Sequence, residues 1–204
     1  RLLPVAESAS AEAFSFVGLN GRRDQVKGAA VLQWAFNPSA HMPDNDTFTE
    51  NLPAILDQVR TMRAVAGTAA KVRLDRLGFD SPYPRAARDL RNGGLFGGAW
   101  LAAAIGYAGL AGVDEAVVAV GPGPAADWVA RELGGLAGCA IHAVRTDGPP
   151  PPPVFAYATA RPGQAKPDLW LVNLTDDAQA VAVAEIEAGQ VTLNRLNTAT
   201  LAAT

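Results

Sequence analysis

The order of strand-like and helix-like segments limits the fold of this chain more than any other feature. Up to about residue 136, short apolar runs typical of buried strands alternate with segments in which apolar residues recur every three or four positions. This alternation predicts a parallel α/β sheet or barrel. The predicted strands cover residues 2–6, 13–19, 31–36, 70–75 and 115–120, and the predicted helices cover residues 48–66, 93–113 and 125–136.

The pattern changes after residue 137, where short strands separated by turn residues replace the alternation. No helix fits among these strands, so the sequence predicts a small antiparallel β-sandwich module. We therefore expect two domains, covering residues 1–137 and 138–204. The strands expected in the second domain are 140–144, 154–160, 169–174, 178–186 and 191–196.

The start of the helix predicted over 48–66 has two interpretations. Thr47 and Glu50 have the spacing of a capping box, but Pro53 would then lie inside the helix. With Asn51 as the cap, Pro53 falls in the first turn, where proline is tolerated.

The segment 93–113 contains no charged residue, and it is long enough to raise the alternative of a membrane-spanning helix. More than half of its residues are Gly or Ala, so its hydrophobicity is weak for a membrane span. A helix buried against a sheet is the better interpretation. The spacing of Gly94 and Gly98 then predicts close packing against a neighbouring helix.

Composition excludes several classes of function. The net charge is −3, from 17 basic and 20 acidic residues, and no basic block suggests nucleic acid or an anionic membrane as a partner. Cys139 is the only cysteine, which excludes an intrachain disulfide and favours a reducing, cytoplasmic location. Neither a histidine–carboxylate pair at metal-ligand spacing nor a phosphate-binding glycine loop is present, so we expect no metal and no cofactor.

Polar residues gather directly after the predicted strand 31–36. Asn37, His41, Asp44 and Asp46 all lie between this strand and the next helix. Ligands of α/β proteins bind outside the carboxyl ends of the strands, so this loop is a candidate site. In the alternative interpretation, Asn37 and His41 only fix the loop, and Asp46 or Thr47 caps the helix.

A second candidate lies on the next predicted strand, at Arg73 and Asp75. Alternation along a strand places these two side chains on the same face. If that face lines the interior of a barrel, the pair is both buried and polar, which requires a partner network or a function. Asp75 also lies near the strand end, where a substrate hydroxyl would bind.

The chain resembles the D-apionate lactonase-like proteins, which are relatives of clan-A glycoside hydrolases. The resemblance rests on the pattern Asn37-Pro38-x-x-His41-x-x-Asp44 with Asp46 and Glu50, on Leu95-Phe96-Gly97-Gly98-Ala99-Trp100, and on Leu171-Val172-Asn173-Leu174-Thr175. It implies a (β/α)8 barrel followed by a β-sandwich, with this chain corresponding to the C-terminal half. Its earlier barrel strands would then come from a second copy of the chain or from a missing N-terminal half.

The resemblance implies a hydrolase that opens a sugar lactone by attack of water. Such a reaction needs a base and a group that stabilises the developing oxyanion. His41 and Asp75 are the predicted catalytic residues, and Asn37, Asp44 and Arg73 are predicted to bind the substrate.

One departure from the family pattern favours a different function. The acidic residue expected after the last barrel strand is absent, and this place reads Val118-Ala119-Val120-Gly121-Pro122-Gly123-Pro124. A chain without this carboxylate fits a non-catalytic carbohydrate-binding or assembly protein. Both functions share a sugar or a sugar lactone as the ligand.

Overall fold

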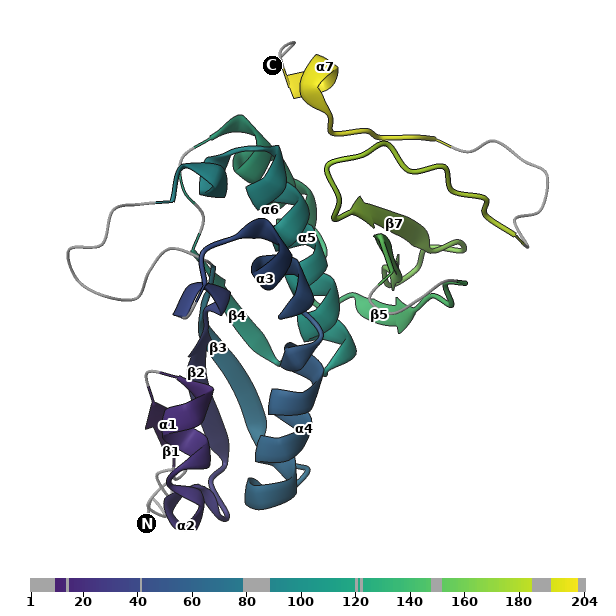
Figure 1. The fold of residues 1–204 in the computed structure, drawn as a ribbon. Coiled ribbons are helices and arrows are strands. Elements are labelled where there is room, and N and C mark those ends of the chain that lie inside the picture. Colours follow the sequence, from purple (N-terminus) through teal and green to yellow (C-terminus); the bar gives the residue numbers. More distant parts are fainter. Residues whose placement is uncertain are drawn as a thin grey trace. The chain divides into compact units, whose positions relative to one another are not determined.

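The chain forms two compact units, each built around its own sheet (Figure 1). The computed structural model describes residues 10–13, 15–40, 42–78, 89–119, 121, 123–147, 152–184 and 192–201. Among these, the first unit contains residues from 1–89 and 103–120, and the second contains residues from 90–102 and 121–204. Helix α5 (Leu95–Leu110) contributes its first half to the second unit and its second half to the first.

A four-stranded parallel sheet forms the centre of the first unit, and its strand order, β1-β2-β3-β4, follows the chain. Helices connect each strand to the next, as the alternation in the sequence predicts. The strand predicted over 13–19 is wrong, because Phe16–Asn20 form a helix whose first turn is capped by the Ser15 side chain. The strand predicted over 2–6 lies outside the described residues. The strands are β1 (Ser10–Ala13), β2 (Val31–Phe36), β3 (Lys71–Leu77) and β4 (Glu115–Val118). The connecting helices are α1 (Phe16–Asn20), α2 (Arg23–Val26), α3 (Asn45–Glu50), α4 (Ala54–Ala66) and α5, with the short 3-10 turns η1 (Pro38–Ala40) and η2 (Leu90–Gly93).

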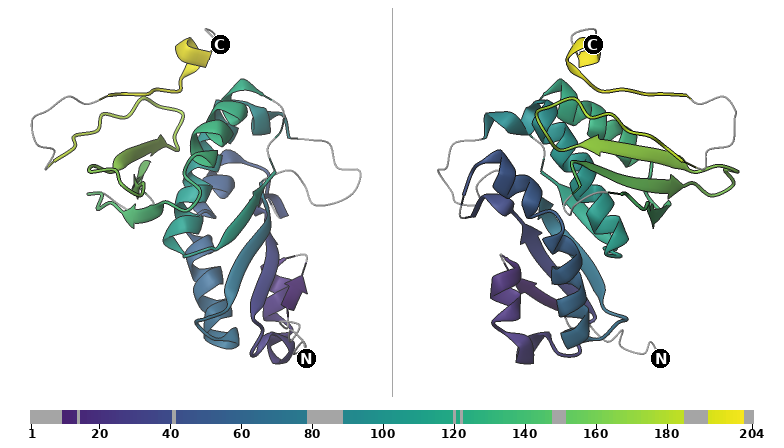
Figure 2. Two further views of the ribbon diagram at one scale, coloured as in Figure 1. Left: turned by 180° about the vertical axis from the view of Figure 1, so that it is seen from behind. Right: turned by 45° about the vertical axis from the view of Figure 1, so that its right-hand side comes forward.

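One face of this sheet, which we call the helix face, carries the core of the first unit. Helix α4 runs along the strands (Figure 2), and Trp34 Nε1 on β2 donates a hydrogen bond of 3.0 Å to Gln58 Oε1 on α4. Burying the apolar side chains of the helix face supplies the main driving force for folding this unit. The strand residues of the helix face are at most 4% exposed: Leu32, Trp34, Phe36, Val72, Leu74 and Leu77.

Proline splits the helix predicted over 48–66 into two. Helix α3 ends at Glu50, and α4 begins at Ala54 with Pro53 as its N-cap residue. Proline lacks the N–H that a helix interior requires, so it stands just outside the new helix. Both predicted starts are wrong. The N-cap of α3 is Asp44, not Asp46 or Thr47, and the N-cap of α4 is Pro53, not Asn51.

The second unit combines helices with a three-stranded antiparallel sheet of order β5-β6-β7. Tyr157 on β6 is fully buried, and its hydroxyl donates a hydrogen bond of 3.1 Å to the carbonyl of Ala102 on α5. The ring of Trp170 stacks on Tyr157 with a centroid distance of 5.9 Å and an interplanar angle of 3°. The elements are α6 (Pro124–Gly134), β5 (Ala140–Ala143), β6 (Val154–Ala160), β7 (Asp168–Asn173) and α7 (Thr198–Leu201).

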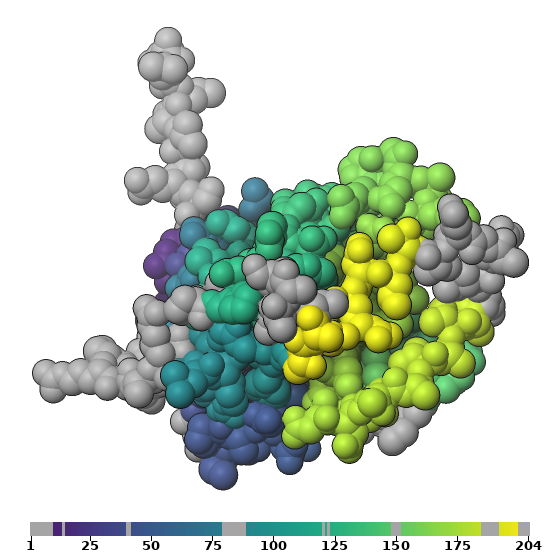
Figure 3. Space-filling view, turned by 90° about the horizontal axis from the view of Figure 1, so that it is seen from above, coloured from purple at the N-terminus to yellow at the C-terminus, as the bar shows by residue number. Residues whose placement is uncertain are grey.

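Two predicted strands of this module do not form. Residues 178–184 and 192–196 belong to no strand, although the predicted strands covered 178–186 and 191–196. Their apolar side chains are exposed, with Val181 at 47%, Val183 at 44% and Leu193 at 69%. These segments lie at the surface of the second unit, coloured yellow-green and yellow in Figure 3. The described strands of this unit thus form one sheet.

Helix α5 accounts for most of the uncharged segment 93–113. Its side chains are largely buried, with Ala103 and Ala104 fully inaccessible to solvent. Gly98 lies against Ala125 of α6, where an added Cβ would be 3.3 Å from the Ala125 carbonyl oxygen, so the predicted close packing at this glycine is confirmed. None of the helices in the described part of the chain has the length and apolar content needed to cross a membrane.

The buried hydroxyl of Tyr157 predicts both a loss of stability on mutation and a dependence on pH. Burial raises the pKa of Tyr157 well above its usual value of 10.0. Tyr157→Phe should lower the free energy of unfolding by about 1 kcal/mol at pH 7, because the hydrogen bond to Ala102 is lost. Above pH 10 the unfolded chain releases this proton while the folded chain keeps it, so the wild-type stability should fall by up to about 1.4 kcal/mol per pH unit for this tyrosine. Urea unfolding between pH 7 and 11 should therefore show a shallower fall for the variant, and parallel curves would contradict the raised pKa.

Gly78, directly after β3, allows the ends of β3 and β4 to approach closely. A Cβ at this position would lie 2.6 Å from the backbone oxygen of Ala119. Gly78→Ala should therefore destabilise the fold by about 1–3 kcal/mol in urea unfolding, because backbone has to move. Gly134→Ala is the matched control, since no atom lies within 4 Å of its added Cβ. An equal effect of the two substitutions would argue against a close contact at Gly78.

Candidate functional site

The face of the parallel sheet opposite the helix face is polar, and we call it the open face. Parallel sheets are usually apolar on both faces because helices cover both. Here the open face carries charged and amide side chains from three neighbouring strands. We call them the open-face cluster: Gln33 on β2, Arg73, Asp75 and Arg76 on β3, and Glu115 on β4.

Strand register places part of this cluster in one row across the sheet. Glu12 on β1 is paired with Gln33, Gln33 with Arg73, and Arg73 with Glu115. Arg73 Nη2 lies 3.6 Å from Glu115 Oε1, and the two side chains are 40% and 60% exposed. Ion pairs this exposed contribute little to stability, so holding the fold together is a poor explanation for this row.

A β-bulge in β3 brings a third charged residue to the open face. Trp34 on β2 is opposite Leu74, but the next residue, Ala35, is opposite Arg76, so Asp75 is the extra residue. Arg76 thereby shares the row of Ala35, while Leu77 returns to the helix face opposite Phe36. Strict alternation would have placed Arg76 on the helix face. Bulges often redirect side chains next to binding and active sites.

Three polar atoms of β3 are buried without a hydrogen-bond partner among the described residues: Arg73 Nε, Asp75 Oδ1 and Arg76 Nε. The other carboxylate oxygen, Asp75 Oδ2, accepts a long hydrogen bond of 3.4 Å from Gln33 Nε2. A buried polar atom without a partner costs about 1–3 kcal/mol, so such atoms usually meet an ordered water, a ligand or a group with a functional role. Among the described residues, the open-face cluster thus leaves two donors and one acceptor without a partner.

The loop residues predicted to bind substrate take part in local turns. Asn37 Oδ1 accepts hydrogen bonds from the backbone N–H and the hydroxyl of Ser39, at 2.8 and 2.6 Å. Asp44 caps α3, because its two carboxylate oxygens accept from the backbone N–H and the hydroxyl of Thr47, both at 2.8 Å. His41 lies outside the described residues. The substrate-binding roles of Asn37 and Asp44 therefore stay predictions, whereas Arg73 and Asp75 lie together in the open-face cluster.

Three members of the cluster were missed by sequence reasoning. Gln33 had a visible signal, since it is the one polar residue in the apolar run of β2. Glu115 was not predicted as a site residue, because the strand that it begins was identified by its apolar residues. Arg76 stands beside Asp75 at the predicted strand end but was given no role, because a bulge changes which face a residue occupies and leaves no mark in local sequence.

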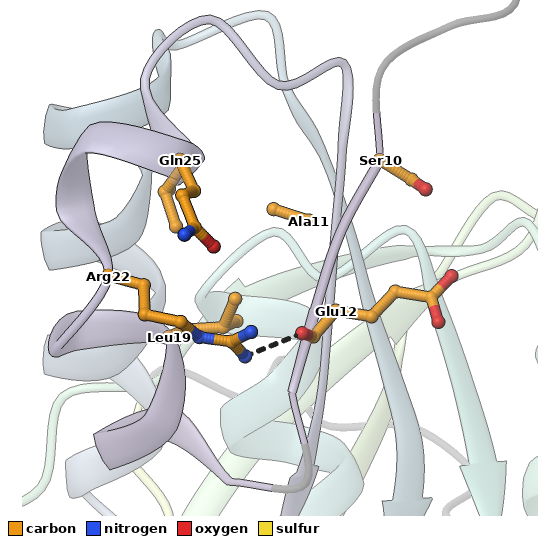
Figure 4. A pocket seen from close by; sticks show the side chains of 7 residues that line it. Ser10, Ala11, Glu12, Leu19, Arg22 and Gln25 are labelled. Carbon is orange, nitrogen blue, oxygen red and sulfur yellow. Dashed lines mark hydrogen bonds between the residues drawn. The ribbon is translucent and has the colours of Figure 1, made fainter.

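A separate pocket of about 210 Å³ lies beside β1, between this strand and helices α1 and α2 (Figure 4). Arg22 spans it, donating to the backbone oxygens of Glu12 at 2.8 Å and Gly18 at 3.1 Å. The side chain of Glu12 points away from Arg22 in this view. Ligand pockets usually measure about 300–1,000 Å³, and the guanidinium of this one already has partners. The open-face cluster is the stronger candidate for a sugar-sized ligand.

Neither a metal-binding group nor a known relative points to a role for the chain. Within the part of the chain that the structure describes, no group of three or more His, Cys, Asp or Glu side chains could hold a metal ion. No family model, no curated protein and no solved structure matches the chain. The chemistry of the open-face cluster is therefore the best guide to function.

The N-cap role of Asp44 can be tested by stability alone. Asp44→Ala should lower the free energy of unfolding by about 1 kcal/mol, because both hydrogen bonds to Thr47 are lost. Asp46→Ala is the matched control: Asp46 lies in the first turn of the same helix, where a carboxylate contributes only through the helix dipole, about 0.3–1 kcal/mol. Thermal and urea unfolding of both variants gives the comparison. A smaller loss for Asp44→Ala than for Asp46→Ala would contradict the cap.

Proposed function

We propose that this chain is part of a carbohydrate-active hydrolase that opens a sugar lactone, and that the substrate binds at the open-face cluster. The observation that carries the proposal is Asp75 Oδ1, a buried carboxylate oxygen without a hydrogen-bond partner among the described residues. It lies beside unpaired guanidinium N–H groups on a strand whose neighbours are fixed by the sheet. Resemblance to lactonase-like proteins supplies the substrate class.

The arrangement of the sheet supports the proposed barrel. In a doubly wound α/β sheet the strand order reverses and helices cover both faces, whereas in a barrel the strands follow chain order and the helices lie outside. This sheet follows chain order, and its open face is polar. Closing it with further strands would turn the open face into the barrel interior. In the same proposal, the three-stranded sheet of the second unit belongs to a β-sandwich.

Further strands would have to pair at the two edges of this sheet. Among the described residues, β1 pairs only with β2 and β4 only with β3. Unpaired edges present free backbone N–H and C=O groups that readily accept another strand. We propose that the completing strands come from a second copy of the chain or from an N-terminal half of the barrel.

The cluster contains the groups that lactone hydrolysis requires. Water attacks the carbonyl carbon and gives its proton to a base. The ring C–O bond then breaks, and the ring oxygen takes the proton back from the base and leaves as a hydroxyl. Asp75 Oδ1 accepts a hydrogen bond from a substrate hydroxyl, while Gln33 Nε2 donates to Asp75 Oδ2. Arg73 donates to the oxyanion that develops on the carbonyl oxygen.

The proposal also keeps the loop after β2 as a contributor. His41 follows Asn37 by four residues and is the proposed base for the attacking water, since histidine titrates near neutral pH. The single cysteine fits the proposed cytoplasmic location.

A second function, sugar binding without hydrolysis, is favoured by one observation. The end of β4 carries Val118 and Ala119 where a catalytic acid would stand in a glycosidase-like barrel. The same cluster would then hold a sugar through Arg73, Asp75 and Gln33 without breaking a bond. Lactone turnover distinguishes the two functions, because only the hydrolase converts the lactone to the acid.

Hydrolysis of a panel of aldonolactones at pH 7 tests the proposal, with base uptake followed in a pH-stat. Asp75→Asn should reduce kcat/KM by about 10- to 100-fold, because a neutral amide oxygen accepts a weaker hydrogen bond from the substrate than a carboxylate does. The matched control is Asp57→Asn, since Asp57 is an exposed aspartate that pairs with Arg60 on α4. Full activity of Asp75→Asn would refute the proposed role of Asp75. Binding of sugars by the wild type without turnover of any lactone would favour the binding function.

A further inference from the structure

Arg76 is the one guanidinium of the open-face cluster for which the described part of the chain shows neither a hydrogen bond nor an ion pair. Arg73, on the same strand, lies 3.6 Å from Glu115. Asp75 is partly satisfied by Gln33. The bulge therefore places on the open face a positive charge that no other member of the cluster neutralises.

The environment of Arg76 makes this charge costly without a ligand. Its Nε is buried, and its row partner on β2 is Ala35, which offers neither charge nor hydrogen bond. Charged groups that lose water are normally paired or hydrogen-bonded. A ligand with a negative charge would restore both interactions at once, because guanidinium forms two parallel hydrogen bonds to a carboxylate.

The neighbouring Asp75 limits which anion fits. It is adjacent to Arg76 in the chain, and the bulge puts both side chains on the open face. A dianion such as a phosphate ester would be repelled more strongly by this carboxylate than a single carboxylate would. The donors and the acceptor around it, Arg73 Nε and Asp75 Oδ1, suit hydroxyl groups.

We infer that the open-face cluster selects a sugar acid, whose carboxylate binds Arg76 while its hydroxyls bind Asp75 and Arg73. This inference rests on the proposed role of the open face in binding a sugar derivative. It adds to that role that the ligand carries a negative charge. The product of lactone opening is itself a sugar carboxylate, so the same contact would also hold the product.

Matched pairs of sugars that differ in one carboxylate test the inference. The pairs are glucuronate and glucose, galacturonate and galactose, and mannuronate and mannose, titrated calorimetrically into the protein at pH 7 and low salt. At least one acid should bind the wild type about 10- to 100-fold more tightly than its neutral partner, the range expected for hydrogen bonds to a charged group. Arg76→Gln should remove most of this preference, and Arg76→Lys should keep only part, because lysine retains the charge without the two-pronged geometry.

The control is Arg60→Gln, which removes an exposed cation from α4 and should leave the preference unchanged. Melting temperatures of all variants confirm folding. An unchanged preference in Arg76→Gln, or equal binding of acid and neutral sugar by the wild type, would overturn the inference. Lactone hydrolysis measured in parallel keeps the two proposals apart. If the wild type hydrolyses lactones in a way that depends on Asp75 but shows no preference for acids, only this inference is refuted. If it binds acids through Arg76 but hydrolyses no lactone, only the proposed hydrolase is refuted.

Discussion

The β-bulge at Asp75 determines what the parallel sheet presents on its open face. Without the extra residue, the side chains of β3 would alternate regularly, and Arg76 would point into the apolar helix face beside Phe36. Burying an unpaired guanidinium there would cost several kcal/mol, more than a typical single interaction supplies. With the bulge, Leu77 occupies the helix face at 0% exposure, and Arg73, Asp75 and Arg76 share the other face. The packing of the apolar core and the position of the open-face cluster thus both depend on this bulge.

The two faces of the sheet differ in what they contribute to stability. On the helix face, six apolar side chains are at most 4% exposed, and Gln58 satisfies the one polar atom of Trp34. On the open face, a partly exposed ion pair and a hydrogen bond of 3.4 Å contribute little, and three buried polar atoms have no partner among the residues that the structure describes. Stability therefore comes from one face while the other face carries an energetic cost. Such an imbalance is typical of a surface kept for binding.

Local patterns predicted the elements whose burial the sequence itself encodes. The apolar run 31–36 became β2, and the uncharged segment 93–113 became the buried helix α5. Prediction failed where structure depends on a partner distant in sequence. Residues 178–184 alternate Val and Ala as a strand would, but strand formation needs a neighbouring edge that no local pattern supplies. The register of β3 against β2 also depends on residues far apart in the sequence. Local patterns therefore could not show that Arg76 shares a face with Asp75, and Arg76 was assigned no role.

The candidate site changed for a related reason. Asn37 and Asp44 have the side chains of ligand-binding residues, but the same oxygens that could bind a sugar also stabilise turns and helix starts. In the structure these oxygens accept hydrogen bonds from Ser39 and Thr47. Residues in the middle of a parallel strand have no comparable local use for a charge. A charge there must meet a partner across the sheet or a ligand, and the strand holds it more rigidly than a loop would. Any change that removed the extra residue of β3 would therefore alter the open-face cluster and the apolar core together.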